Sequence, residues 1–170
     1  MPHPLVTQLR FTRSEFLRAL EGVTAEEAAR RFEPMNSIAW MIGHLAWHEQ
    51  LLWLERAQGQ VVAAEAKQCG FGAPASNPPF DQMVRAWHTI TKAADPYLDT
   101  LTPDALLTCY GRDTRRTPES VGTSLLRITY HYWYHLGESQ AVRQLLGHRN
   151  LPPFVGDIGS RAPYRPEVTA

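Results

Sequence analysis

The sequence predicts an all-α protein, a four-helix bundle with a long crossover connection between its second and third helices. Apolar residues recur every three or four positions in four long segments, and no segment alternates apolar and polar residues as a half-buried strand does. Residues 58–80 are rich in glycine and proline. This connection exceeds the usual length of about 2–8 residues between bundle helices, so it predicts a crossover and not a tight hairpin.

The first helix is expected to end near Gly22, which is a stop signal. Its apolar stripe consists of Leu5, Leu9, Phe16 and Leu20. A short helix should follow, because Thr24 stands three residues ahead of Glu27 in a capping-box pattern.

The second long helix is expected to begin at the cap Asn36-Ser37 and to run to about Ala57. It has hardly any polar face. Its apolar residues are Ile38, Trp40, Met41, Ile42, Leu45, Trp47, Leu51, Leu52, Trp53 and Leu54. A helix that is apolar almost all round is buried on several sides or lies at a subunit interface.

The third helix is expected to start with Asp81 as its cap and to break or kink at Asp95-Pro96, which reads as a cap followed by a proline at a first helical position. An irregular stretch should separate it from the last helix. Thr117 as cap and Pro118 at the first position predict where that last helix begins.

Gly147 predicts the C-terminal end of the last helix, which would be roughly 43 Å long at about 1.5 Å per residue. Residues 1–148 are therefore expected to form one helical bundle domain. Residues 149–170 are rich in proline and glycine, and we expect this tail to pack on the surface of the bundle.

Composition excludes several classes of function. The 17 basic residues equal the 17 acidic ones, so no electrostatic footprint for nucleic acid is present. No apolar run approaches the roughly 20 residues that span a bilayer. Cys69 and Cys109 form no CxxC pair, which argues against a disulfide framework and favours a reducing compartment. We expect a soluble cytoplasmic protein.

Two pairs of histidines carry the chemistry that the sequence suggests. His131 and His135 are four residues apart, as are His44 and His48 in the apolar second helix, and this spacing places each pair on one helical face. Such histidines either border the core or bind a metal. Two imidazoles from one helix and a third from a facing helix suit zinc, nickel or ferrous iron and leave one coordination position free, as in catalytic zinc sites.

Other catalytic and metal-binding motifs are absent, and the remaining histidines have no predicted catalytic role. The sequence contains no HExxH, no Glu-x-x-His pairs of di-iron bundles and no GxSxG. His3 and His148 stand near the ends of expected elements, where capping or solvation is expected, and His88 receives no role.

Two segments, SIAWMIGHLAWHEQLLW (residues 37–53) and HYWYHLGESQAVRQLLG (residues 131–147), resemble the second and last helices of the DinB-like (damage-inducible) four-helix bundles. The resemblance implies one divalent metal ion, zinc or nickel before iron, held by His44, His131 and His135. His48 is not a usual member of this triad. It remains a partner of a ligand, an alternative ligand or a core residue, and we favour a non-ligand role.

The resemblance also implies two alternative functions. One is a metal-dependent enzyme, a thiol-dependent S-transferase or a hydrolase, that acts on a low-molecular-weight thiol and a small electrophile. In that enzyme Tyr134 and Glu138 would either orient water or a ligand proton, or be an ordinary half-buried tyrosine and a solvated glutamate. Arg127 would either face an anionic substrate or be an ordinary surface arginine. The other is a non-catalytic, stress-associated metal-binding protein.

Members of the family often dimerise through bundle helices, so the resemblance implies a homodimer. Exposed tryptophans on the second helix, namely Trp40, Trp47 and Trp53, would suit such an interface.

Overall fold

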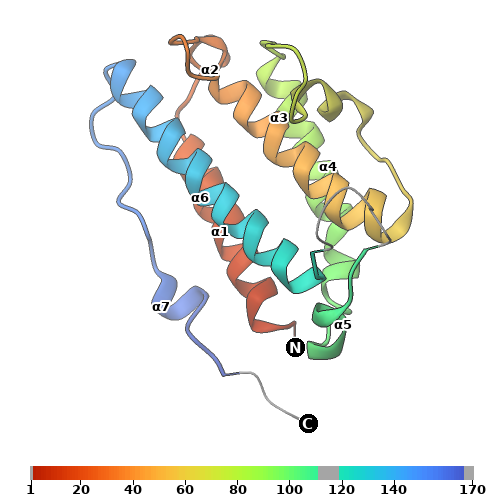
Figure 1. Ribbon diagram of the computed structural model, residues 1–170. Coiled ribbons are helices and arrows are strands. Elements are labelled where there is room, and N and C mark those ends of the chain that lie inside the picture. The colour runs from red at the N-terminus through yellow and green to blue at the C-terminus, as the bar shows by residue number, and fades with distance from the viewer. Residues whose placement is uncertain (1, 111–118, 167–170) are drawn as a thin grey trace.

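The computed structural model describes residues 2–110 and 119–166, and within these ranges it contains helices and no strand (Figure 1). The long helices are α1 (Pro4–Leu20), α3 (Ile38–Glu49), α4 (Phe80–Leu98) and α6 (Val121–Leu145). A π-helix, η1 (Gln50–Arg56), continues α3. The short elements are α2 (Ala25–Ala29), the 3-10 helix η2 (Ala64–Cys69), α5 (Pro103–Leu107) and α7 (Ile158–Arg161). The predicted all-α class is confirmed.

The crossover connection is also present. After η1 the chain returns along α3 to the far end of the bundle, so that α3 and α4 pack side by side and run in the same direction (Figure 1). On this path the Cys69 carbonyl lies 2.6 Å from Nδ1 of His44, and the Asn77 amide donates to the Ala29 carbonyl at 2.7 Å. The crossover therefore covers the outer side of α3 at the level of the histidines.

The core is formed by apolar side chains of all four long helices. α6 packs against α1 and α3, and α3 packs against α4. Among the largest side chains with less than 2 % exposure are Leu9, Phe16, Met41, Trp53 and Ile90. Each such side chain stabilises the fold by about 1.5–3 kcal/mol relative to leaving it in water.

The apolar character of the second long helix has a structural reason. The α-helix ends at Glu49, and the wider i→i+5 turns of η1 follow. Three consecutive residues, Leu52, Trp53 and Leu54, are at most 1 % exposed there. Trp53 is therefore in the core, and it does not supply the exposed tryptophan that a dimer interface was expected to use.

Several predicted caps are confirmed. Ser37 caps α3 by accepting a hydrogen bond from the backbone of Trp40, and Thr24 and Glu27 form the capping box of α2. The last helix begins at Val121 with Ser120 as its cap. The predicted start at Thr117 and Pro118 lies outside the described residues.

The predicted break at Asp95-Pro96 is wrong, because α4 continues through Pro96 to Leu98. A proline so close to the end of a helix removes only one intrahelical hydrogen bond. The Asp95 carboxylate caps nothing. Instead it accepts hydrogen bonds from Arg13 at 2.9 Å and Arg10 at 3.2 Å, which fasten this end of α4 to α1.

Two other boundaries also differ from the prediction. α4 begins at Phe80 after Pro79, so Asp81 lies in the first turn, where its charge suits the helix dipole. The stretch expected to be irregular contains α5, which begins at Pro103. Its cap, Thr102, accepts a hydrogen bond from the Ala105 backbone at 3.2 Å.

The C-terminal segment lies along α1, as hydrogen bonds at three levels show. Arg18 donates to the Pro153 carbonyl, Glu15 accepts from the Gly156 backbone, and Gln8 donates to a carbonyl at the end of α7. Within the described ranges, no helix has the length and apolar character needed to cross a bilayer.

Candidate metal centre

The structure brings three histidines together between α3 and α6. His44 comes from α3, and His131 and His135 come from successive turns of α6. One ring nitrogen of each lies within 4.8 Å of one ring nitrogen of the other two. Nε2 of His131 and Nε2 of His135 are 3.0 Å apart. His44 and His135 are only 7 % and 5 % exposed, so the group lies at the edge of the core.

The outer nitrogens of two of these rings have hydrogen-bond acceptors. Nδ1 of His44 lies 2.6 Å from the Cys69 carbonyl oxygen, and Nδ1 of His135 lies 2.7 Å from Oε2 of Glu138. Carbonyl and carboxylate oxygens only accept, so both Nδ1 atoms carry the ring proton. In the neutral form of each ring, Nε2 is then a lone pair directed toward the group, which is the tautomer that a metal ligand requires.

The third ring, His131, uses a different partner. Its Nδ1 lies 2.8 Å from Nδ1 of His48, one helical turn beyond His44 on α3. His48 therefore touches the group from outside. Within the part of the chain that the structure describes, the three-histidine group contains no fourth histidine, cysteine or carboxylate.

Burial favours the neutral form of two imidazoles of the group. Burial lowers the pKa of His44 to about 4, against the smaller opposite effect of the Cys69 carbonyl. Burial, followed by the nearby histidines, lowers the pKa of His131 to about 2. Because only a neutral imidazole binds a metal, both residues are in the ligating form near pH 7.

Aromatic rings hold His44 in place. Trp40 stacks on the His44 ring with centroids 4.5 Å apart, and Trp47 stacks on it at 5.4 Å. Gly70 makes room for Trp47, because a Cβ at this position would come within 3.1 Å of the indole. The two half-buried tryptophans thus position a histidine instead of lying free on the surface. The Tyr134 ring contacts the His135 ring edge-on at 5.1 Å and is 70 % exposed.

The other singled-out residues have ordinary structural contacts. The Arg127 guanidinium forms an ion pair with Glu119, and His88 is exposed on α4. His3 caps α1 through a hydrogen bond from the Leu5 backbone at 3.2 Å. His148 lies 2.9 Å from the Glu27 carboxylate.

Sequence reasoning missed a second polar cluster beside the histidines. Arg13 donates two hydrogen bonds to Glu49, at 2.7 and 2.5 Å, and Tyr132 donates to the same carboxylate at 2.9 Å. Trp87 donates to the Tyr132 hydroxyl at 2.6 Å. Burial opposes the charge on Arg13, but the Glu49 carboxylate raises its pKa above the ordinary value. This cluster joins all four long helices.

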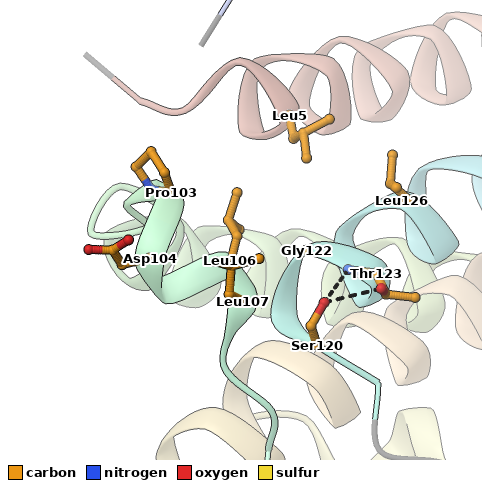
Figure 2. A pocket seen from close by; sticks show the side chains of 9 residues that line it. All are labelled: Leu5, Pro103, Asp104, Leu106, Leu107, Ser120, Gly122, Thr123 and Leu126. Atoms are coloured by element: carbon orange, nitrogen blue, oxygen red, sulfur yellow. Dashed lines mark hydrogen bonds between the residues drawn. The ribbon is translucent and has the colours of Figure 1, made fainter. Parts of the chain in front are cut away.

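A separate pocket of about 340 Å³ lies between α1, α5 and the first turn of α6 (Figure 2). Leucine side chains form much of its wall, and the Ser120 hydroxyl is occupied in capping α6 at Thr123. No residue of the histidine group lines it. Its lining residues are Leu5, Pro103, Asp104, Leu106, Leu107, Ser120, Gly122, Thr123 and Leu126.

The fold and the histidine group define a class of protein, the four-helix bundles with a possible metal site on facing helices. Comparison with known proteins places the chain within that class. It belongs to the DinB superfamily, whose family model matches residues 8–139.

A similar solved structure is that of a conserved protein from Enterococcus faecalis, with a TM-score of 0.60 and 17 % sequence identity over 85 % of this chain and 96 % of that one. At this identity the likeness concerns the fold alone. No curated protein matches the sequence.

Proposed function

We propose that the protein binds one divalent metal ion through Nε2 of His44, His131 and His135, with zinc or nickel preferred over iron. The observation that carries this proposal is the orientation of the rings: their inner nitrogens converge, while the outer nitrogen of each has a hydrogen-bond partner. Three imidazoles are a donor set that these borderline ions favour.

We further propose that the site is catalytic. Three protein ligands leave a coordination position for an exogenous molecule, whereas structural zinc sites are closed by four. When bound, the ion supplies Lewis acidity, which lowers the pKa of a thiol or water. The protein then holds its ligands in place: Glu138 keeps the proton of His135 on Nδ1, and Trp40 and Trp47 keep the His44 ring from turning.

Thiol-dependent S-transfer or hydrolysis is the reaction class that we propose for this site, with a low-molecular-weight thiol and a small electrophile as substrates. We also propose that the protein acts as a homodimer. A site closed to exogenous ligands would instead indicate the non-catalytic metal-binding role.

Cobalt substitution tests this proposal. The protein is loaded with Co²⁺, and its visible absorption is followed while 2-mercaptoethanol is added. We expect intense d–d bands on loading and a further saturable spectral change with the thiol. Bands that do not change when the thiol is added would support the non-catalytic role. The absence of d–d bands would contradict metal binding by the three histidines.

A further inference from the structure

We propose that His48 is a positioning residue of the metal site, which accepts a hydrogen bond from Nδ1–H of His131 and thereby fixes the tautomer and orientation of that ligand. The inference rests on the proposed function, because it assigns a role toward the same metal ion. It concerns a residue that the three-histidine group does not include.

The direction of the hydrogen bond follows from the proposed role of His131 as a ligand. Nδ1 of His48 and Nδ1 of His131 are 2.8 Å apart, so one of them carries a proton and the other a lone pair. Nε2 of His131 faces Nε2 of His135 at 3.0 Å, inside the group. A ligating Nε2 has no proton, so the His131 proton is on Nδ1. With the ion bound, His48 therefore accepts at Nδ1 and carries its own proton on Nε2.

His48 completes a set of three acceptors. The Cys69 carbonyl serves His44 and the Glu138 carboxylate serves His135. Only His131 would lack a partner without His48. Such outer partners fix ring orientation and raise ligand basicity, and losing one typically costs about 10–100-fold in metal affinity.

The neighbouring residues hold His48 at this distance from His131. Glu49 follows His48 on α3, Tyr132 follows His131 on α6, and the Tyr132 hydroxyl donates to the Glu49 carboxylate at 2.9 Å. Both of these residues are fully buried. The two helices are thus joined one residue beyond the histidine pair. In addition, the Trp47 ring stacks on the His48 ring with centroids 5.9 Å apart.

The same geometry argues against His48 as a fourth ligand. Its Nδ1 is directed at the outer nitrogen of His131, on the side of that ring away from His135. A metal between His48 and His131 would be a second ion, with His131 as a bridge. The number of ions per chain separates that arrangement from a hydrogen bond.

Three variants test the role of His48. His48→Leu removes the acceptor. His48→Asn keeps one, because the amide oxygen of asparagine is attached to Cγ as Nδ1 is. His88→Asn, in the exposed histidine of α4, is the control. Zinc affinity is measured by competition with a chromophoric chelator, the Co²⁺ absorption spectrum is recorded, and circular dichroism of the metal-free proteins checks folding.

We expect His48→Leu to lose about 10–100-fold in zinc affinity and to alter the cobalt spectrum. His48→Asn should restore most of the affinity, and His88→Asn should match the wild type. Folded His48→Leu protein with wild-type affinity and spectrum would overturn the inference but leave the metal site intact. The same conclusion would follow if His48→Asn lost as much zinc affinity as His48→Leu. It would also follow if the wild type bound two ions per chain and His48→Leu bound one. A wild-type protein that binds no ion would overturn the proposed function and this inference together.

Discussion

Two polar clusters lie next to each other between α3 and α6, and they differ in how their hydrogen-bonding atoms are used. In the cluster of Arg13, Glu49 and Tyr132, the guanidinium, both carboxylate oxygens and the hydroxyl bond to one another. In the histidine cluster the outer ring nitrogens have partners outside the three-histidine group, and the inner nitrogens face each other. The first cluster is complete within the protein, whereas the second leaves its inner nitrogens for the metal ion that we propose.

The difference is notable because the two clusters use adjacent residues. His48 and Glu49 are neighbours on α3, and His131 and Tyr132 are neighbours on α6. Adjacent side chains on a helix point about 100° apart, so one member of each pair enters the core and the other faces its edge. We infer that the closed cluster fixes the distance between the helices and that the open cluster uses this distance to bind a metal. Substitutions in each cluster separate these two roles.

The largest effect is expected from Glu49→Ala. It leaves the Arg13 guanidinium, only 5 % exposed, without its bidentate partner and should lower the free energy of unfolding by about 3–5 kcal/mol. Urea denaturation of the metal-free protein measures this. The free energy of unfolding of the double variant Arg13→Met/Glu49→Leu should be closer to that of the wild type, because replacing both charged residues removes the cost of burying the charges. An equal loss of unfolding free energy in the single and double variants would contradict the role of the Arg13–Glu49 pair.

Metal binding should give the next largest effect, and only through the histidine cluster. Zinc at a free concentration 100-fold above its dissociation constant should stabilise the wild type by about 2.7 kcal/mol. His131→Ala should gain nothing from zinc. Thermal unfolding with zinc and with a chelator measures the difference. An equal zinc-dependent rise in the Tm of both proteins would show that the ion binds elsewhere.

A glycine behind the open cluster should be sensitive to a single methyl group. A Cβ at Gly43 would lie 2.5 Å from Sδ of Met83 and 2.6 Å from Sγ of Cys69. Gly43→Ala should therefore destabilise by about 1–3 kcal/mol, and it should weaken zinc binding because it displaces the residue whose carbonyl orients His44.

Gly137 on α6 is the matched control, since a Cβ there meets no atom within 4 Å outside its own helix. Gly137→Ala should stabilise the protein by about 0.5–1 kcal/mol. Denaturant titration measures the free energy of unfolding of both variants. A Gly43→Ala protein as stable as Gly137→Ala would show that Gly43 is not tightly packed against Met83 of α4 and Cys69 of η2.

The smallest effect concerns pH, at a site away from both clusters. The Thr24 backbone N–H, followed by His148, lowers the pKa of Glu27 to about 2. A carboxylate with a lowered pKa stabilises the fold above its ordinary pKa, and this contribution is lost as the pH falls from about 4.5 toward 2. The Tm difference between the wild type and Glu27→Gln should shrink over this range. A difference that stays constant down to pH 2 would contradict the assignment.

The sequence was sufficient where local rules decide the outcome. A spacing of four residues placed His131 and His135 on one face, and the long Gly- and Pro-rich connection indicated the crossover. Rules of this kind failed where contacts distant in sequence decide. Arg10 and Arg13 bind Asp95 and α4 continues past Pro96, although the dipeptide resembles a helix start.

Other features had no local signal at all. The π-helix begins at Gln50, whose side chain bonds to the backbone of Val62 and Ala63 in the crossover. The Cys69 carbonyl reaches His44 by the same path. Neither contact follows from residue types, because both depend on where the crossover lies against α3.

Elemental mass spectrometry on untagged protein tests the central claim most directly. The wild type, His135→Ala and His44→Ala are incubated with zinc or nickel, desalted, and measured for metal per chain, with circular dichroism as the check on folding. The account predicts about one ion per wild-type chain and none in either folded variant. A wild type without metal, or folded variants that retain it, would contradict the claim that these histidines form a metal site.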